Sequence, residues 1–197
     1  MKPILNTEQH TVLILCKKCG GSPTIRAHLI PLSFVHRIRD GHKKIHAHYK
    51  KRPGIHLVQS ILFDDNILCA ACDREIGVLD KYAVEFCANF KASHSSLIYP
   101  YFSVNNANTN FLIRFAASVI WRCSISSLWQ TNEINLGAET DIFKSIIFNE
   151  SQTPIIYPQV GFMRYTSNLY NVEHFCALPT LTEVNGVRFY VIEIIRI

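Results

Sequence analysis

Apolar residues recur at helical spacing in three parts of the chain. They stand at positions 76, 79, 83 and 86, on one face of a helix that begins just after Cys72. The segment 110–129 is apolar nearly all round, which predicts a helix buried in the core. The segment 137–149 predicts a further amphipathic helix. Inside the apolar segment, Arg114 and Arg122 must each find a carboxylate or carbonyl partner, or extend to the surface.

Short β-prone runs lie on both sides of these helices. The segments 24–30 and 56–63 predict strands, and Pro31 ends the first of them because its ring removes a hydrogen-bond donor. The polar run 64–66 then predicts a turn. Near the end of the chain, Asn185-Gly186 between two apolar runs predicts a hairpin with a type I′ turn.

These elements together predict an α+β protein of two units. The segment 91–110 is rich in Ser, Asn and Tyr, and we interpret it as the connection between them. The first unit spans 1–90. The second spans 91–197, where helices pack against a small antiparallel β-structure and serve as core support or as the contact in a homodimer.

Composition excludes several classes of protein. The chain has 197 residues, of which 48% are hydrophobic and 18% charged, as in an ordinary globular protein. It holds no run of about 18 apolar residues, so we expect no membrane partner. Its seven cysteines are an odd number, which favours a reducing compartment over a disulfide framework. We therefore expect a cytoplasmic protein.

Positive charge is concentrated in one segment. Residues 36–52 carry seven Lys or Arg and four His against one Asp, although the net charge of the whole chain is only +5. Such a segment can contact the phosphates of a nucleic acid, and it can equally be a solvated loop. The contacts that we expect in the first case come from Lys43, Lys44, Lys50, Lys51 and Arg52.

Four of the cysteines form two CxxC pairs. Cys16 and Cys19 make the first pair, Cys69 and Cys72 make the second, and 49 residues separate the two pairs. Two such pairs complete a tetrahedral, all-cysteine zinc site. Four thiolates leave no open coordination position, so this zinc is expected to be structural, and any catalysis must come from other groups.

Two motifs near these pairs resemble those of the HNH, or ββα-metal, nuclease family. The first is Ala27-His28-Leu29-Ile30-Pro31, which matches an acid-His-Ile-x-Pro motif except at Ala27. The second runs from Asn66 to Asp73, and Asp73 takes the place where the family commonly has His or Asn. The resemblance covers about a third of the chain. It implies that the first unit is a zinc-bound treble clef.

The chain also resembles a set of bacterial proteins that have no established activity. They share a Ser-His-Ile-Ile-Pro motif, a Leu-Leu-Cys-x-x-Cys-Glu motif and a later helix with Trp-Arg. The matching segments here are Ile67 to Asp73 and Ala117 to Arg122. This resemblance extends over most of the chain.

The resemblance to HNH nucleases implies roles for three residues. His28 would be the general base, because an imidazole titrates near neutral pH. Asp73 would bind a catalytic Mg²⁺ or Mn²⁺ ion, and Asn66 would brace the loop of the active site. Each has a structural alternative: His28 as a strand histidine, Asp73 as an acid favoured at a helix N-terminus, and Asn66 as a turn residue.

The sequence thus predicts a metal-dependent endonuclease that hydrolyses phosphodiester bonds in DNA, or less favourably in RNA. The resemblance implies a place in bacterial defence. The alternative is a catalytically inactive zinc module that binds nucleic acid or a partner protein. Ala27 is the residue that separates the two hypotheses, because the family usually has a second metal-binding carboxylate there.

Overall fold

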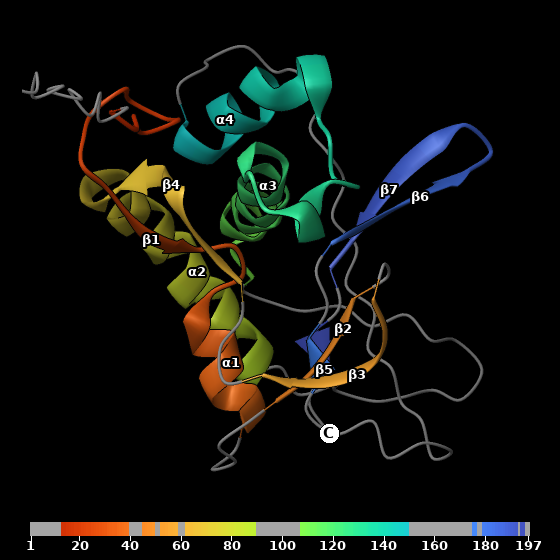
Figure 1. Cartoon of the computed structure of the whole chain (residues 1–197). Helices are drawn as coiled ribbons and strands as arrows, with labels where there is room; N and C mark the ends of the chain where they lie inside the picture. Colours follow the sequence, from red (N-terminus) through yellow and green to blue (C-terminus); the bar gives the residue numbers. More distant parts are fainter. Residues whose placement is uncertain are drawn as a thin grey trace, which may run out of the picture.

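A computed structural model describes residues 13–39, 45–49, 52–58, 62–89, 107–149, 175–176, 179–192 and 194–195. In this part of the chain the protein is a mixed α+β structure with four α-helices and small sheets, as predicted. The helices are α1 (Leu32–Arg39), α2 (Ala70–Asn89), α3 (Thr109–Ile125) and α4 (Thr140–Phe148). Helix α3 lies at the centre of the molecule, with α2 and α4 on either side of it (Figure 1).

The two pairs of cysteines flank a two-stranded antiparallel sheet whose strands are far apart in the sequence. Strand β1 (Thr24–His28) pairs antiparallel with β4 (Phe63–Cys69), and α2 follows β4 without a connecting loop. The register shifts at one point, because Arg26 alone faces the three residues 65–67 of β4. This bulge lies in the middle of the two-stranded sheet.

Two sequence predictions fail in this region. The predicted turn at 64–66 is wrong, because these residues belong to β4. The predicted strand at 56–63 is displaced as well: β3 covers Arg52–Val58, and β4 begins at Phe63. The physical reason is Asp64, a buried residue whose carboxylate accepts hydrogen bonds from Ser126 and Ser127. These partners are remote in the sequence, so the polar run is indistinguishable locally from a turn.

Helix α2 confirms its predicted face. Ile76, Leu79 and Ala83 are buried, and Phe86 packs against the same core. Asp73 lies on the first turn of the helix, as expected. The helix begins at Ala70, so Cys69 ends the strand and Cys72 lies on the first helical turn.

Helices α3 and α4 form the rest of the core. Asn108 caps α3 by accepting a hydrogen bond from the Phe111 amide at 3.1 Å. Helix α4 follows a short 3-10 helix, Gly137–Glu139, and ends at Asn149, which is left-handed with φ of 56°. The predicted helix at 137–149 is thereby confirmed. The buried apolar residues form one cluster that includes both predicted units, whose division at residue 90 stays a prediction.

The basic segment is not simply a loop. Strand β2 (Ile45–Tyr49) lies within it and pairs antiparallel with β3. Strand β2 also pairs in parallel with β5 (Phe175–Cys176), which in turn pairs with β8 (Ile194–Ile195). The charged composition suggested a loop, although β2 pairs along its whole length with β3, which begins only three positions after β2 ends.

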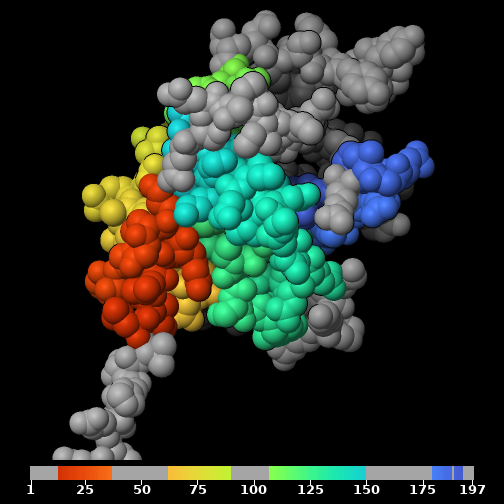
Figure 2. Space-filling model, turned by 90° about the horizontal axis from the view of Figure 1, so that it is seen from above, coloured from red at the N-terminus to blue at the C-terminus, as the bar shows by residue number. Residues whose placement is uncertain are grey.

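The predicted hairpin at Asn185-Gly186 is confirmed. Strands β6 (Thr180–Val184) and β7 (Val187–Val191) pair through a turn whose two residues have φ of 53° and 76°. Positive φ at both positions is what a type I′ turn requires. The hairpin projects from the body of the molecule in both views (Figures 1 and 2).

Candidate functional site

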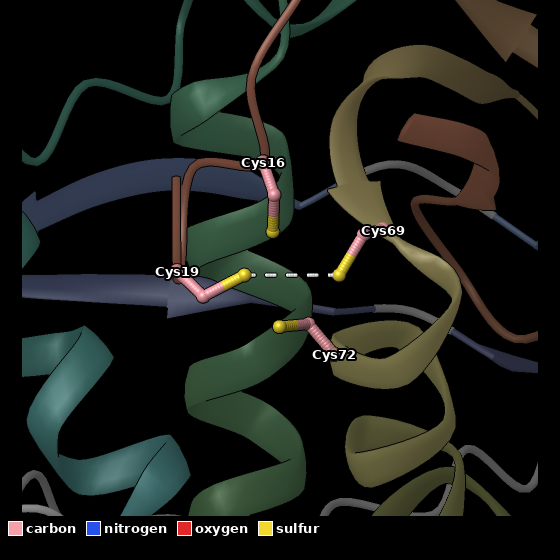
Figure 3. Close-up of side chains that lie close together, drawn as sticks. All are labelled: Cys16, Cys19, Cys69 and Cys72. Carbon is pink, nitrogen blue, oxygen red and sulfur yellow. Dashed lines mark hydrogen bonds between the residues drawn. The ribbon is translucent and has the colours of Figure 1, made fainter. Parts of the chain in front are cut away.

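The four cysteines of the two CxxC pairs come together in space. Their sulfur atoms all lie within 4.8 Å of one another, and the Cys19 and Cys69 sulfurs are 3.8 Å apart (Figure 3). A tetrahedral zinc ion with bonds of about 2.3 Å would hold its sulfur ligands about 3.8 Å apart. The cluster is therefore compatible with zinc, and the described residues hold no other group of three or more metal-binding side chains.

A tight turn presents the first pair of cysteines. The Cys16 amide donates to the Gly21 carbonyl, and the Gly20 amide donates to the Cys16 carbonyl, each at 2.8 Å. Gly20 has φ of 72°, a conformation that other residues rarely adopt. The Gly21 amide points at the Cys19 sulfur at 3.4 Å. An amide so placed stabilises a thiolate, which is the form that binds a metal.

The surroundings affect the four thiols unequally. Burial opposes ionisation of Cys16, but the backbone amides of Cys19, Cys69 and Lys18 outweigh it and lower its pKa to about 6. Burial raises the pKa of Cys72. Cys16 and Cys72 therefore do not become thiolates together by themselves, and a divalent cation at the centre of the cluster would drive that change.

A second site opens next to the cysteine cluster. A pocket of about 440 Å³ is lined by His28 at the end of β1 and by Asp73 on the first turn of α2. Both side chains are half-buried. The structure thus brings together two of the three residues that the motifs singled out. The full lining is His28, Pro31, Leu32, Ser33, Asp73, Gly77, Asp80, Lys81, Val84, Glu85 and Arg122.

The pocket favours the neutral form of the His28 imidazole. Burial lowers the pKa of His28, and the positive charge of Arg26 lowers it further, whereas the Asp73 carboxylate works in the opposite direction. Burial also raises the pKa of Asp73, against the effects of Arg122 and His28. A neutral imidazole has a free lone pair at neutral pH, so it can accept a proton or bind a cation.

A buried ion pair supports the floor of this pocket. Arg122 of α3 is 1% exposed, and its guanidinium bonds both oxygens of Asp80 at 2.9 and 3.0 Å. The same guanidinium donates to the His28 carbonyl at 2.9 Å, and to the Ser118 carbonyl and hydroxyl at 3.2 and 3.3 Å. All five N–H groups therefore have acceptors. The ion pair fixes the end of β1 against α2 and α3.

The sequence alone predicts part of the bonding around these arginines. It required a partner for Arg122, and it required one for Arg114, which donates to the Ile147 carbonyl at 2.9 Å. It missed Asp80. The available signal was spacing, because Asp73 and Asp80 are seven residues apart and so lie two turns apart on one face of α2.

Asn66 does not line the pocket. It lies in the bulge of β4, half-buried, and its backbone N–H donates to the Asp64 carboxylate at 2.8 Å. The other oxygen of Asp64 accepts from the Ser126 hydroxyl at 2.7 Å and the Ser127 amide at 2.9 Å. Asp64 thus joins the bulge to the chain that follows α3, and sequence reasoning had treated it only as a turn residue.

The predicted nucleic-acid contacts fall largely outside the described structure. Lys43, Lys44, Lys50 and Lys51 are not among the described residues. Arg52 is the first residue of β3, and its side chain is likewise outside the description. Their role stays a prediction from composition.

Comparison with known proteins adds no relative. No family model, no curated protein and no solved structure matches the chain. Within the described residues, no helix has the length and apolar character needed to cross a membrane. The function must therefore be argued from the geometry of the pocket and the cysteine cluster.

Proposed function

We propose that this protein is a metal-dependent nuclease that hydrolyses phosphodiester bonds in DNA. The observation that carries the proposal is the pocket in which His28 of β1 and Asp73 of α2 meet. The two residues come from motifs that lie 45 positions apart. Each motif predicts one catalytic residue by its resemblance to the nuclease family, and the two residues line one pocket.

The order of elements around the pocket supports this proposal. A cysteine turn precedes β1, β1 pairs with β4, and β4 leads directly into α2. This is the arrangement that the resemblance to ββα-metal nucleases implies, with the histidine on the first strand and a metal ligand on the helix. In this proposal the cysteine cluster binds a structural zinc ion, which fixes β4 and α2 relative to the first cysteine turn.

The roles of the two residues follow from the chemistry of hydrolysis. His28, neutral in its half-buried position, accepts the proton of the attacking water. Asp73 offers carboxylate oxygens, and no described residue forms an ion pair with it. When bound, a Mg²⁺ or Mn²⁺ ion would stabilise the negative charge that develops on the phosphate. One protein carboxylate suffices to hold such an ion if water and phosphate oxygens supply the other ligands.

Asp80 is not available as the second carboxylate ligand. Both its oxygens are bonded to the Arg122 guanidinium, whose distances of 2.9 and 3.0 Å are those of a bidentate pair. Its role is to hold Arg122, and through Arg122 the His28 carbonyl, in place. We therefore assign Asp80 and Arg122 to positioning.

One observation favours the alternative of an inactive zinc module. Ala27, at the position of the family's acid, is completely buried. This position contributes to packing and supplies no metal ligand. An inactive module would keep the cysteine cluster and the basic segment, and would bind DNA or a partner protein without cutting it.

Cleavage of supercoiled plasmid in the presence of Mg²⁺ or Mn²⁺ decides between the two. We expect the wild-type protein to nick the plasmid and His28→Ala to lose this activity by roughly 100-fold or more, because general base catalysis contributes about 10²–10⁴. The matched control is His36→Ala. His36 is an exposed histidine on α1 that does not line the pocket, so its loss should leave nicking unchanged.

Binding of DNA without cleavage would support the alternative. DNA binding by a wild-type protein that cuts under none of these divalent ions would establish the inactive module and refute the nuclease. Equal loss of nicking in His28→Ala and His36→Ala would show that the assay reports a general defect of the protein and not the pocket.

A further inference from the structure

Three side chains form a continuous row beside the pocket. The Arg26 guanidinium carbon lies 3.3 Å from the centre of the Phe63 ring, close enough for direct stacking. The Phe63 ring also meets the His28 imidazole in an edge-to-face arrangement, with the two ring centres 6.2 Å apart and the ring planes at 61°. Phe63 is the register partner of His28 across β1 and β4. The row therefore runs from Arg26, over Phe63, to the proposed general base.

The alternation of the strand explains this placement. Ala27 points into the core and is completely buried, so Arg26 and His28 on either side of it point to the opposite face. The bulge of β4 opposite Arg26 adds room there, because one residue of β1 faces three of β4. Arg26 is consequently exposed while His28 is half-buried.

No carboxylate in the described part of the chain forms an ion pair with Arg26, in contrast to Arg122, which has Asp80. The field of Arg26 nevertheless reaches the pocket, because it contributes to the lowered pKa of His28. A guanidinium that is oriented by stacking next to the site is suited to a planar or tetrahedral oxyanion.

We propose that Arg26 binds the scissile phosphate of the DNA and stabilises its charge during cleavage. This inference rests on the proposed nuclease function and adds a residue that no motif singled out. The stack on Phe63 holds the guanidinium in a fixed plane, so less entropy is lost when it bonds two phosphate oxygens. A lysine ammonium has no such plane, so it would supply the positive charge but could not bond two phosphate oxygens in the same geometry.

The test measures cleavage and binding of a labelled DNA duplex separately. Under single-turnover conditions with saturating enzyme and Mg²⁺, we expect Arg26→Ala to cleave roughly 10- to 100-fold more slowly than the wild type, the effect of losing a charge-assisted hydrogen bond. Arg26→Lys should recover part of the rate. The matched control is Arg74→Ala, an exposed arginine on α2 that does not line the pocket, with an unchanged rate.

A folding defect would appear as a loss of the zinc stoichiometry or of the far-ultraviolet circular dichroism, and both are expected to be unchanged in Arg26→Ala. An Arg26→Ala protein that cleaves at the wild-type rate overturns the inference while the nuclease proposal survives. If the wild type cuts no DNA, the nuclease proposal fails, and fluorescence anisotropy then tests Arg26 alone. Binding weakened about tenfold in Arg26→Ala, and not in Arg74→Ala, supports a phosphate contact, whereas equal binding overturns it.

Discussion

The cysteine cluster and the His28 pocket lie side by side on the same helix, yet they are held by different means. Cys72 and Asp73 are consecutive residues on the first turn of α2. The cluster joins two short motifs whose ligands are adjacent in the sequence, and its stability would come from one metal ion. The pocket depends on the Arg122 bond to the His28 carbonyl, between residues 94 positions apart, and on the pair with Asp80. A local motif therefore specifies the first site, and the packing of α3 specifies the second.

Removal of zinc should have the largest effect. Structural zinc contributes roughly 10 to 16 kcal/mol to the folding of zinc-finger peptides, and here it would join the N-terminal turn to β4 and α2. We expect Cys69→Ser to lose the metal and to lower the midpoint of thermal unfolding by more than about 10 °C. Native mass spectrometry should show one zinc per wild-type chain and none in the variant.

Cys87→Ser is the matched control for that experiment. Cys87 is an exposed cysteine on the same helix, outside the cluster, so both zinc content and thermal midpoint should stay unchanged. A wild-type chain that carries no metal after purification in zinc-containing buffer would contradict the zinc assignment.

Disruption of the Arg122–Asp80 pair should have the next largest effect. Arg122→Met leaves a buried carboxylate without its partner, which typically costs about 3–5 kcal/mol in the free energy of unfolding. Zinc binding should persist, since the cluster makes no use of this pair. Urea unfolding measures the loss of stability, and the double variant Arg122→Met/Asp80→Leu should recover much of it because no buried charge is left over.

The second arginine of α3 provides the control for this comparison. Arg114 makes one bond to a backbone carbonyl, so Arg114→Met should cost only about 1 kcal/mol. Similar losses in the two variants would mean that the buried pair has no special part in supporting the pocket.

The titration of His28 should show the smallest effect. Its pKa in the folded protein lies below the ordinary value of 6.5, so the folded state binds fewer protons than the unfolded state between these two values. This group's contribution to stability is therefore complete above about pH 6.5 and is lost as the pH falls through the folded pKa. A nuclear magnetic resonance titration of the imidazole should place its midpoint below 6.5.

Removing a charged side chain near His28 should shift the midpoint of its titration in a direction that can be checked. Arg26→Ala should raise the midpoint, because the positive charge of Arg26 lowers the pKa of His28, and Asp73→Asn should lower it. Shifts in the opposite directions would contradict the arrangement of charges around the pocket.

The sequence predicts this molecule best where the information is local. The buried face of α2, the helix at 137–149 and the turn at Asn185-Gly186 follow from periodicity and from turn chemistry. The grouping of the four cysteines follows from their spacing in two CxxC pairs. In each of these cases the residues that determine the structure are at most a few positions apart, or carry a chemistry that permits few alternatives.

Prediction fails where a remote partner decides the local structure. Asp64 looks like a turn residue until Ser126 and Ser127 are known to bond its carboxylate within a strand. Asp80 becomes important only because Arg122 of α3 packs against it. No window of the sequence contains both members of any of these pairs.

A long segment of the chain connects β1 and β4, the two strands that support both sites. Between the end of β1 at His28 and the start of β4 at Phe63 the chain runs through the 34 residues 29–62, which include α1, β2 and β3. The entropy of closing a loop grows only with the logarithm of its length, so doubling this segment would cost about 0.6 kcal/mol. The chain between β1 and β4, which carries the basic residues, can therefore be lengthened, shortened or replaced at little cost in free energy, while the cysteine cluster and the residues beside it stay in register.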